Sequence, residues 1–136
     1  MHILLVGDSV IMVMAVVSEL VSRGYRVHGP VMTQAAALDQ AARTSPLDLA
    51  VMNIDLREGR GAGVTLARTL WTDFTIPSLL VGGDSGVAHA SRDAAVGHLM
   101  EPCGPEEVVQ SIEAARNVLF GHPASSPLPR GLALFR

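Results

Sequence analysis

Acid and amide side chains follow several apolar runs of the chain, and their positions indicate where chemistry could occur. Asp8, Asn53, Asp55 and Glu101 each close or directly follow such a run. Short apolar runs predict buried parallel strands, and open α/β sheets place their chemistry at the carboxyl ends of these strands. A carboxylate there could attack a phosphoryl group. The carboxamide of Asn53 has no anionic oxygen with which to do so.

The composition removes several classes of mechanism. All ten basic residues are arginine, so any mechanism that needs a lysine ammonium is excluded. The net charge is −3 and the arginines are scattered along the chain, which argues against nucleic acid as the main partner. The single cysteine, Cys103, cannot form an intramolecular disulfide, which suits a reducing cytoplasm.

Apolar runs alternate with helical patterns along the chain. We expect strands at 2–7, 25–31, 47–56, 78–81 and 97–101. We expect helices at 8–22, 34–44 and 64–71, a short one ending by 95, and a last one at 105–119. Five strands alternating with five helices through short connections predict an α/β fold, a doubly wound five-stranded parallel sheet covered on both faces.

One domain accounts for most of the 136 residues. The alternation ends near residue 120, so we expect a single domain over 1–120 and a C-terminal tail over 121–136. We expect the tail to be partly disordered, although its apolar ending leaves self-association or partner docking open. No apolar stretch approaches the roughly 20 residues of a membrane span, and no secretory signal precedes the first strand. A cytoplasmic protein without a membrane partner is therefore expected.

Five segments carry a resemblance to a known family. They lie at 3–9, 24–30, 47–56, 76–77 and 97–108. In this order and at these distances, residues 2–119 resemble the CheY-like receiver domains of two-component response regulators, in particular stand-alone receivers. The resemblance implies a flavodoxin-like sheet with strand order 2-1-3-4-5.

The family transfers a phosphoryl group onto an aspartate. Two acids after the first strand hold Mg²⁺ with the acceptor, and a serine or threonine after strand four and a lysine after strand five bind the phosphoryl oxygens. Carried onto this chain, those positions hold Gly7 and Asp8 (acid pair), Asn53 (acceptor), Gly82 (hydroxyl), Glu101 (lysine) and His98 (aromatic switch). Asp8 alone keeps the residue type of the family.

These replacements imply a degenerate pocket. One carboxylate beside a neutral amide is a poor Mg²⁺ site, so we expect weak or absent Mg²⁺ binding at Asp8 and no cofactor. We expect Asp8 chiefly to cap the first helix, Asp55 to order the following loop, and His98 to be a partly exposed strand-edge residue. The Glu101–Pro102 peptide bond is expected to be cis, as the lysine–proline bond of the family often is.

The resemblance thus predicts a pseudo-receiver, a non-enzymatic protein of two-component or phosphorelay signalling that is not phosphorylated at Asn53 and acts by binding proteins. A histidine kinase, another regulator or an effector is the expected partner. A homodimer could form through helix four, strand five and helix five, the face that receivers use. Two alternatives stay open: weak phosphorylation at Asp55 or Asp8, and a flavodoxin-like small-ligand module. The loop Gly7-Asp8-Ser9 lacks the serine- and threonine-rich phosphate loop of flavodoxins.

Overall fold

The computed structural model describes residues 1–7, 10–122 and 128–135, with the side chains of the first helix described from Val13 onward. The strands are β1 (His2–Val6), β2 (Arg26–Val31), β3 (Leu49–Asn53), β4 (Ser78–Val81), β5 (Ala95–Leu99) and β6 (Leu132–Leu134). The helices are α1 (Val10–Ser22), α2 (Gln34–Arg43), α3 (Ala62–Phe74), α4 (Ser85–Ala90) and α5 (Pro105–Leu119). The expected helix start at Asp8 and Ser9 lies outside the described residues.

The strands form one sheet in the order β2-β1-β3-β4-β5-β6. The first five strands are parallel, which confirms the doubly wound sheet and its predicted order. The sixth strand was not predicted. It pairs antiparallel with β5, within the segment that the sequence assigns to a tail.

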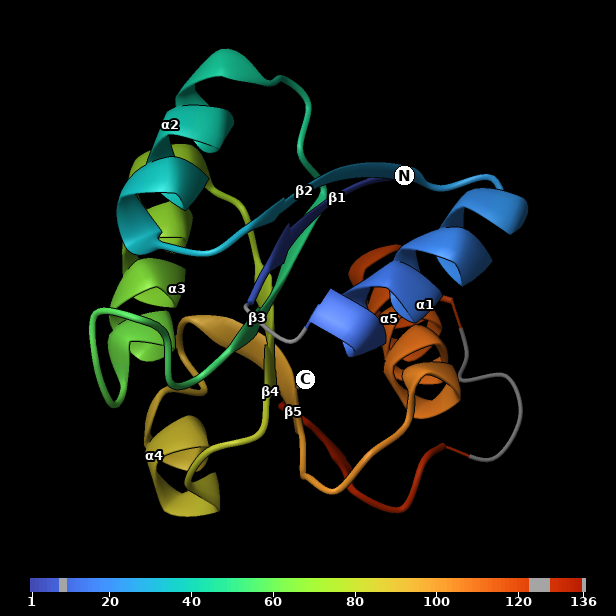
Figure 1. Ribbon diagram of the computed structural model, residues 1–136. Helices are drawn as coiled ribbons and strands as arrows, with labels where there is room; N and C mark the ends of the chain where they lie inside the picture. Colours follow the sequence, from blue (N-terminus) through green and yellow to red (C-terminus); the bar gives the residue numbers. More distant parts are fainter. Residues whose placement is uncertain (8–9, 123–127, 136) are drawn as a thin grey trace.

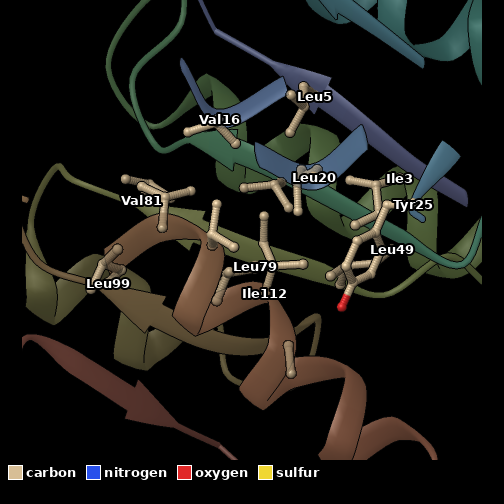
Figure 2. Packing of buried hydrophobic residues seen from close by; sticks show 14 of the residues in the cluster. Ile3, Leu5, Val16, Leu20, Tyr25, Leu49, Leu79, Val81, Leu99 and Ile112 are labelled. Carbon is tan, nitrogen blue, oxygen red and sulfur yellow. The ribbon is translucent and has the colours of Figure 1, made fainter. Parts of the chain in front are cut away.

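Helices cover both faces of the sheet. Figure 1 shows α1 and α5 on one face and α2, α3 and α4 on the other. Strand side chains alternate between these layers. Ile3, Leu5 and Leu49 pack toward α1 and α5, together with Leu20 and Ile112 (Figure 2).

The second layer is built from the intervening positions of the same strands. Leu4, Met52 and Leu80 pack with Leu66 and Leu70 of α3, and all five side chains are buried. Fully burying one such side chain contributes roughly 1.5–3 kcal/mol. The central strands are therefore apolar on both faces, which is why they appear in the sequence as continuous apolar runs.

The glycine-rich connection after β3 is a hydrogen-bonded turn. Leu56 and Gly59 exchange backbone hydrogen bonds of 3.2 and 2.9 Å. Gly63 donates its N–H to the Ile54 carbonyl at 2.7 Å, and a Cβ on Gly63 would overlap the Asn53 carbonyl oxygen. This close approach lets α3 begin two residues earlier than the sequence predicts and seats it against the end of β3.

Strand β5 also lies two residues earlier than the sequence predicts, at Ala95–Leu99, so Glu101 follows the strand. The next helix begins as expected at Pro105, and the Glu107 side chain accepts a hydrogen bond from the Gly104 N–H at 3.1 Å. Among the helices that the structure describes, none combines the length and apolar character needed to cross a bilayer.

Candidate functional site

Four of the predicted site positions meet at the carboxyl edge of the sheet. Gly7 follows β1, Asn53 ends β3, Gly82 follows β4 and Glu101 lies two residues beyond β5. Neighbouring strands bring them together, because Val6 is paired with Met52, Asn53 with Val81, and Val81 with Leu99. The sheet therefore brings these four positions to one edge, whereas Asp8 lies outside the described residues.

The Asn53 amide lies over Gly7. A Cβ at position 7 would come within 3.1 Å of Asn53 Nδ2 and 3.6 Å of its Cγ. The space that an acidic side chain would enter at this position is therefore bordered by a neutral, half-buried carboxamide. Gly7, which stands at one of the two acid positions of the receiver pattern, contributes no charge.

The side chain of Glu101 occupies the space that a side chain at Gly82 would need. Gly82 has φ +71°, a conformation that favours glycine, and a Cβ there would overlap the carboxylate of Glu101. The position that holds a hydroxyl in the family is thus covered by the acid that stands in place of the lysine. A phosphoryl group at this point would meet an anion.

His98 is buried, so the expectation of a partly exposed strand-edge residue is wrong. Its side chain is 3% exposed, and its Nε2 lies 2.8 Å from the Gly82 carbonyl oxygen. The burial has a simple cause, since His98 is paired with Leu80 on one side and with Ala133 of the unpredicted β6 on the other. The hydrogen bond ties the switch position directly to the pocket loop.

Asp55 lies beyond the end of β3 and is exposed. Its Oδ1 accepts a hydrogen bond from the Gly61 N–H at 2.9 Å, a contact that orders the loop before α3. With Arg60 and Asp84 it lines an open groove of about 480 Å³ between the β3–α3 and β4–α4 connections. Asn53 lines a different cavity, so the two side chains do not share a pocket.

The cavity beside Asn53 is small and apolar. It measures about 60 Å³, and Asn53 is the single polar side chain among the described residues that line it. Residues from β1, β3, β4, α1 and α5 form its walls. It has room for about two waters and offers no charged donor from those residues.

The described residues do not fit a Mg²⁺ ion. This ion prefers an octahedron of oxygen ligands and dehydrates reluctantly, whereas Gly7 supplies no carboxylate and Glu101 lies over Gly82. Within the described residues, no group of three or more histidine, cysteine, aspartate or glutamate side chains is arranged to hold a metal.

Residues 101–103, which follow β5, are the last part of the carboxyl edge of the sheet. The Glu101–Pro102 peptide bond is cis, as expected. Burial raises the pKa of the adjacent Cys103 thiol, and the negative charges of Glu101 and Glu107 raise it further. The thiol therefore stays protonated at neutral pH, which argues against a nucleophilic cysteine.

No family model matches the chain, and no curated protein matches it. Solved structures do match. The response regulator receiver domain protein (CheY-like) from Methanospirillum hungatei JF-1 aligns with a TM-score of 0.75 at 19% identity, over 88% of this chain and 96% of that chain. A putative response regulator from Chloroflexus aurantiacus J-10-fl gives a TM-score of 0.71 at 24% identity, over 88% and 97%.

The chain has the CheY-like receiver fold. A third match, the solution structure of the beryllofluoride-activated NtrC4 receiver domain dimer, has a TM-score of 0.75 at 16% identity, over 87% of this chain and 98% of that chain. At such identities the likeness establishes the fold alone.

Sequence reasoning missed two contacts of this receiver fold. One is the contact between Gly82 and Glu101. Both residues were named from the sequence, but their contact was not predicted. The other is the stacked pair of His2 and His28 on β1 and β2, with His2 Nδ1 and His28 Nε2 2.9 Å apart. Strand alternation could have placed both rings on one face, had the register of β1 and β2 been known.

Proposed function

We propose that this chain is a receiver-fold signalling protein that works without phosphorylation and acts by binding other proteins. The observation that carries the proposal is the contact between Glu101 and Gly82. If Gly82 corresponds to the phosphoryl-binding hydroxyl position of a receiver, the Glu101 carboxylate over it supports the proposal by adding an anion there, and the acceptor position holds the carboxamide of Asn53.

Charge and chemistry support the same proposal. Phosphoryl transfer depends on positioning and on neutralising negative charge. Gly7 and Gly82 offer no side-chain group, Asn53 is not a nucleophile and Glu101 adds negative charge. Mg²⁺ binding at this edge is accordingly proposed to be weak or absent, and no enzymatic activity is proposed.

The remaining role of the fold is recognition. Receiver-like proteins of two-component systems act on a histidine kinase, another regulator or an effector, and we place this chain in that class. Its interaction face is the one formed by α4, β5 and α5. Because the pocket does not switch by phosphorylation, binding is governed by the concentration of the partner and by access to this face.

Intact-mass spectrometry tests the proposal. The full chain is incubated with Mg²⁺ and acetyl phosphate beside an active receiver as control, and its mass is expected to stay unchanged. A stoichiometric gain of about 80 Da would overturn the proposal. Loss of that gain in Asp55→Asn would identify Asp55 as the acceptor.

The variant Asn53→Asp extends the test. It restores the nucleophile but leaves Gly7, Gly82 and Glu101 unchanged, so it is expected to remain unlabelled under the same conditions. Robust labelling of this single variant would show that the missing partners matter less than their charges suggest. Beryllofluoride with Mg²⁺ is likewise expected to leave the amide NMR signals near Asn53 unchanged.

A further inference from the structure

The segment 131–135, here called the tail strand, is joined to β5 by regular backbone pairing. Gly97, His98 and Leu99 are paired with Leu134, Ala133 and Leu132, respectively. The Met100 N–H donates to the Gly131 carbonyl and the Phe135 N–H to the Val96 carbonyl, each at 2.9 Å. In Figure 1 the tail strand is the red segment that runs beside β5.

Glycines allow the two backbones to approach closely. A Cβ on Gly97 would lie 2.8 Å from the Ala133 carbonyl oxygen, and a Cβ on Gly131 would lie 3.2 Å from the Met100 carbonyl oxygen. A glycine within a strand weakens it unless another backbone comes near. Gly97 is therefore explained by the tail strand, and the edge of β5 is shaped to receive it.

Side chains of the tail strand reach both layers of the molecule. Leu132 packs against the cluster between the sheet and α1 and α5. Phe135 packs against the opposite cluster, and its ring meets His89 of α4 edge-on, with centroids 5.9 Å apart. The tail strand thus covers the edge of β5 and contacts α4.

This is the face through which the proposed function would operate, so the inference rests on that function. We infer that the tail strand is an autoinhibitory element that fills the β5 edge in cis. A protein partner docks on this face by supplying an extended strand in its place, antiparallel to β5. The partner strand carries apolar side chains at the positions of Leu132, Leu134 and Phe135, whereas the position of the exposed Ala133 sets no requirement.

The backbone of β5 explains why the partner must supply a strand. All five residues of β5 are buried. If the tail strand leaves, the Val96 carbonyl and the Met100 N–H lose their partners, and an unpaired sheet edge is costly. A competing strand restores those hydrogen bonds, which a helix or a loop does not do.

A labelled peptide of residues 128–135 serves as the probe, added to full-length protein and followed by fluorescence anisotropy. In the wild type the tail strand competes at a high effective concentration, so the peptide is expected to bind poorly. The double variant Leu132→Ser/Phe135→Ser loses the apolar contacts of the tail strand and is expected to bind at least about tenfold more tightly. Ala133→Ser is the matched control, because Ala133 is exposed, and it should behave as the wild type.

Two further variants make the result specific. Gly97→Val in the double-variant background should abolish binding, because its side chain blocks the approach of any strand. The variant Phe135→Ser alone should give an intermediate affinity and guards against misfolding of the double variant. Hydrogen exchange of the Phe135 N–H should become faster from the wild type to Phe135→Ser and from Phe135→Ser to the double variant.

The outcomes are distinct from those of the phosphorylation test. Equal peptide affinity for the wild type and the double variant, or no binding to either, would overturn the autoinhibitory strand and leave the unphosphorylated pocket untouched. A mass gain with acetyl phosphate would overturn the proposed function, whereas the peptide assay would still report on the β5 edge.

Discussion

At the pocket edge, the side chain of Glu101 lies over Gly82. The φ of +71° at Gly82 favours glycine, and a Cβ there would displace the exposed side chain of Glu101. Glu101 can lie there because Gly82 leaves the space. A side chain at position 82 would therefore carry backbone strain and push the Glu101 carboxylate aside, and Glu101 would still supply no positive charge.

A double-mutant cycle measures this dependence. Gly82→Ala should lower the free energy of unfolding by roughly 1–3 kcal/mol, partly through backbone strain and partly through overlap with Glu101. Glu101→Ala should remove the overlap and recover part of the loss. Gly121→Ala is the control for strain alone, since Gly121 has φ +68° and nothing within 4 Å of its Cβ. If the two glycine variants lose equal stability, the contact is unimportant.

The sequence was sufficient to locate the pocket but not to describe it. Asn53 was placed at the tip of a predicted strand, where parallel sheets gather their chemistry, and the receiver resemblance added the positions of Gly7 and Gly82. The burial of His98 did not follow, because β6 pairs with β5 there, and Ala133, the partner of His98, lies 35 residues downstream. Such long-range pairing leaves no local pattern in a three-residue strand.

At the scale of elements, the connection from β3 to α3 depends on one close approach. Gly63 lies in the first turn of α3, where helix propensity alone would favour alanine by about 1 kcal/mol. The overlap of its Cβ with the Asn53 carbonyl opposes this preference. The position of Asn53 and the seating of α3 are thus linked.

The variant Gly63→Ala tests this link. It should destabilise the protein by about 1–3 kcal/mol in chemical denaturation, because α3 must move away from β3. Gly86→Ala in α4 is the comparison, since its Cβ would meet one side-chain atom, Asp84 Oδ1 at 3.0 Å, and no backbone atom, and it should lose less stability. A stabilised Gly63→Ala variant would show that propensity outweighs the contact.

Elements with strong local signals were predicted well, and the others less so. β4 and α5 have the predicted bounds, Ser78–Val81 and Pro105–Leu119, because Pro77 and the Gly104-Pro105 pair mark where they start. β5 was placed two residues late because Ala95 and Val96 continue an alanine-rich segment that favours helix. β6 was missed because three residues after a proline-rich segment carry too little periodicity.

For the whole molecule, the packing of His28 against His2 couples stability to pH. Burial lowers the pKa of His28 below its ordinary value of 6.5, and the charges of His2 and Arg26 lower it further. The folded state therefore binds fewer protons than the unfolded state in this range. The contribution of His28 is fully present above pH 6.5 and is lost as the pH falls toward the folded pKa.

Thermal unfolding between pH 7.5 and 5 checks this coupling. The wild type should lose Tm on acidification more steeply than His28→Gln, which cannot gain the proton. His122→Gln is the control, because His122 is exposed, and it should follow the wild type. Identical slopes for all three proteins would exclude His28 as the source of the pH dependence.

The packed layers on the two faces of the sheet also carry different chromophores. The single tyrosine, Tyr25, is buried between the sheet and the helices α1 and α5, and the single tryptophan, Trp71, belongs to α3 on the opposite face. Tryptophan emission and the ring NMR signals of the single tyrosine therefore act as separate reporters of the two layers. Their melting curves, recorded in unmodified protein, would show whether the halves unfold as one cooperative unit or in sequence.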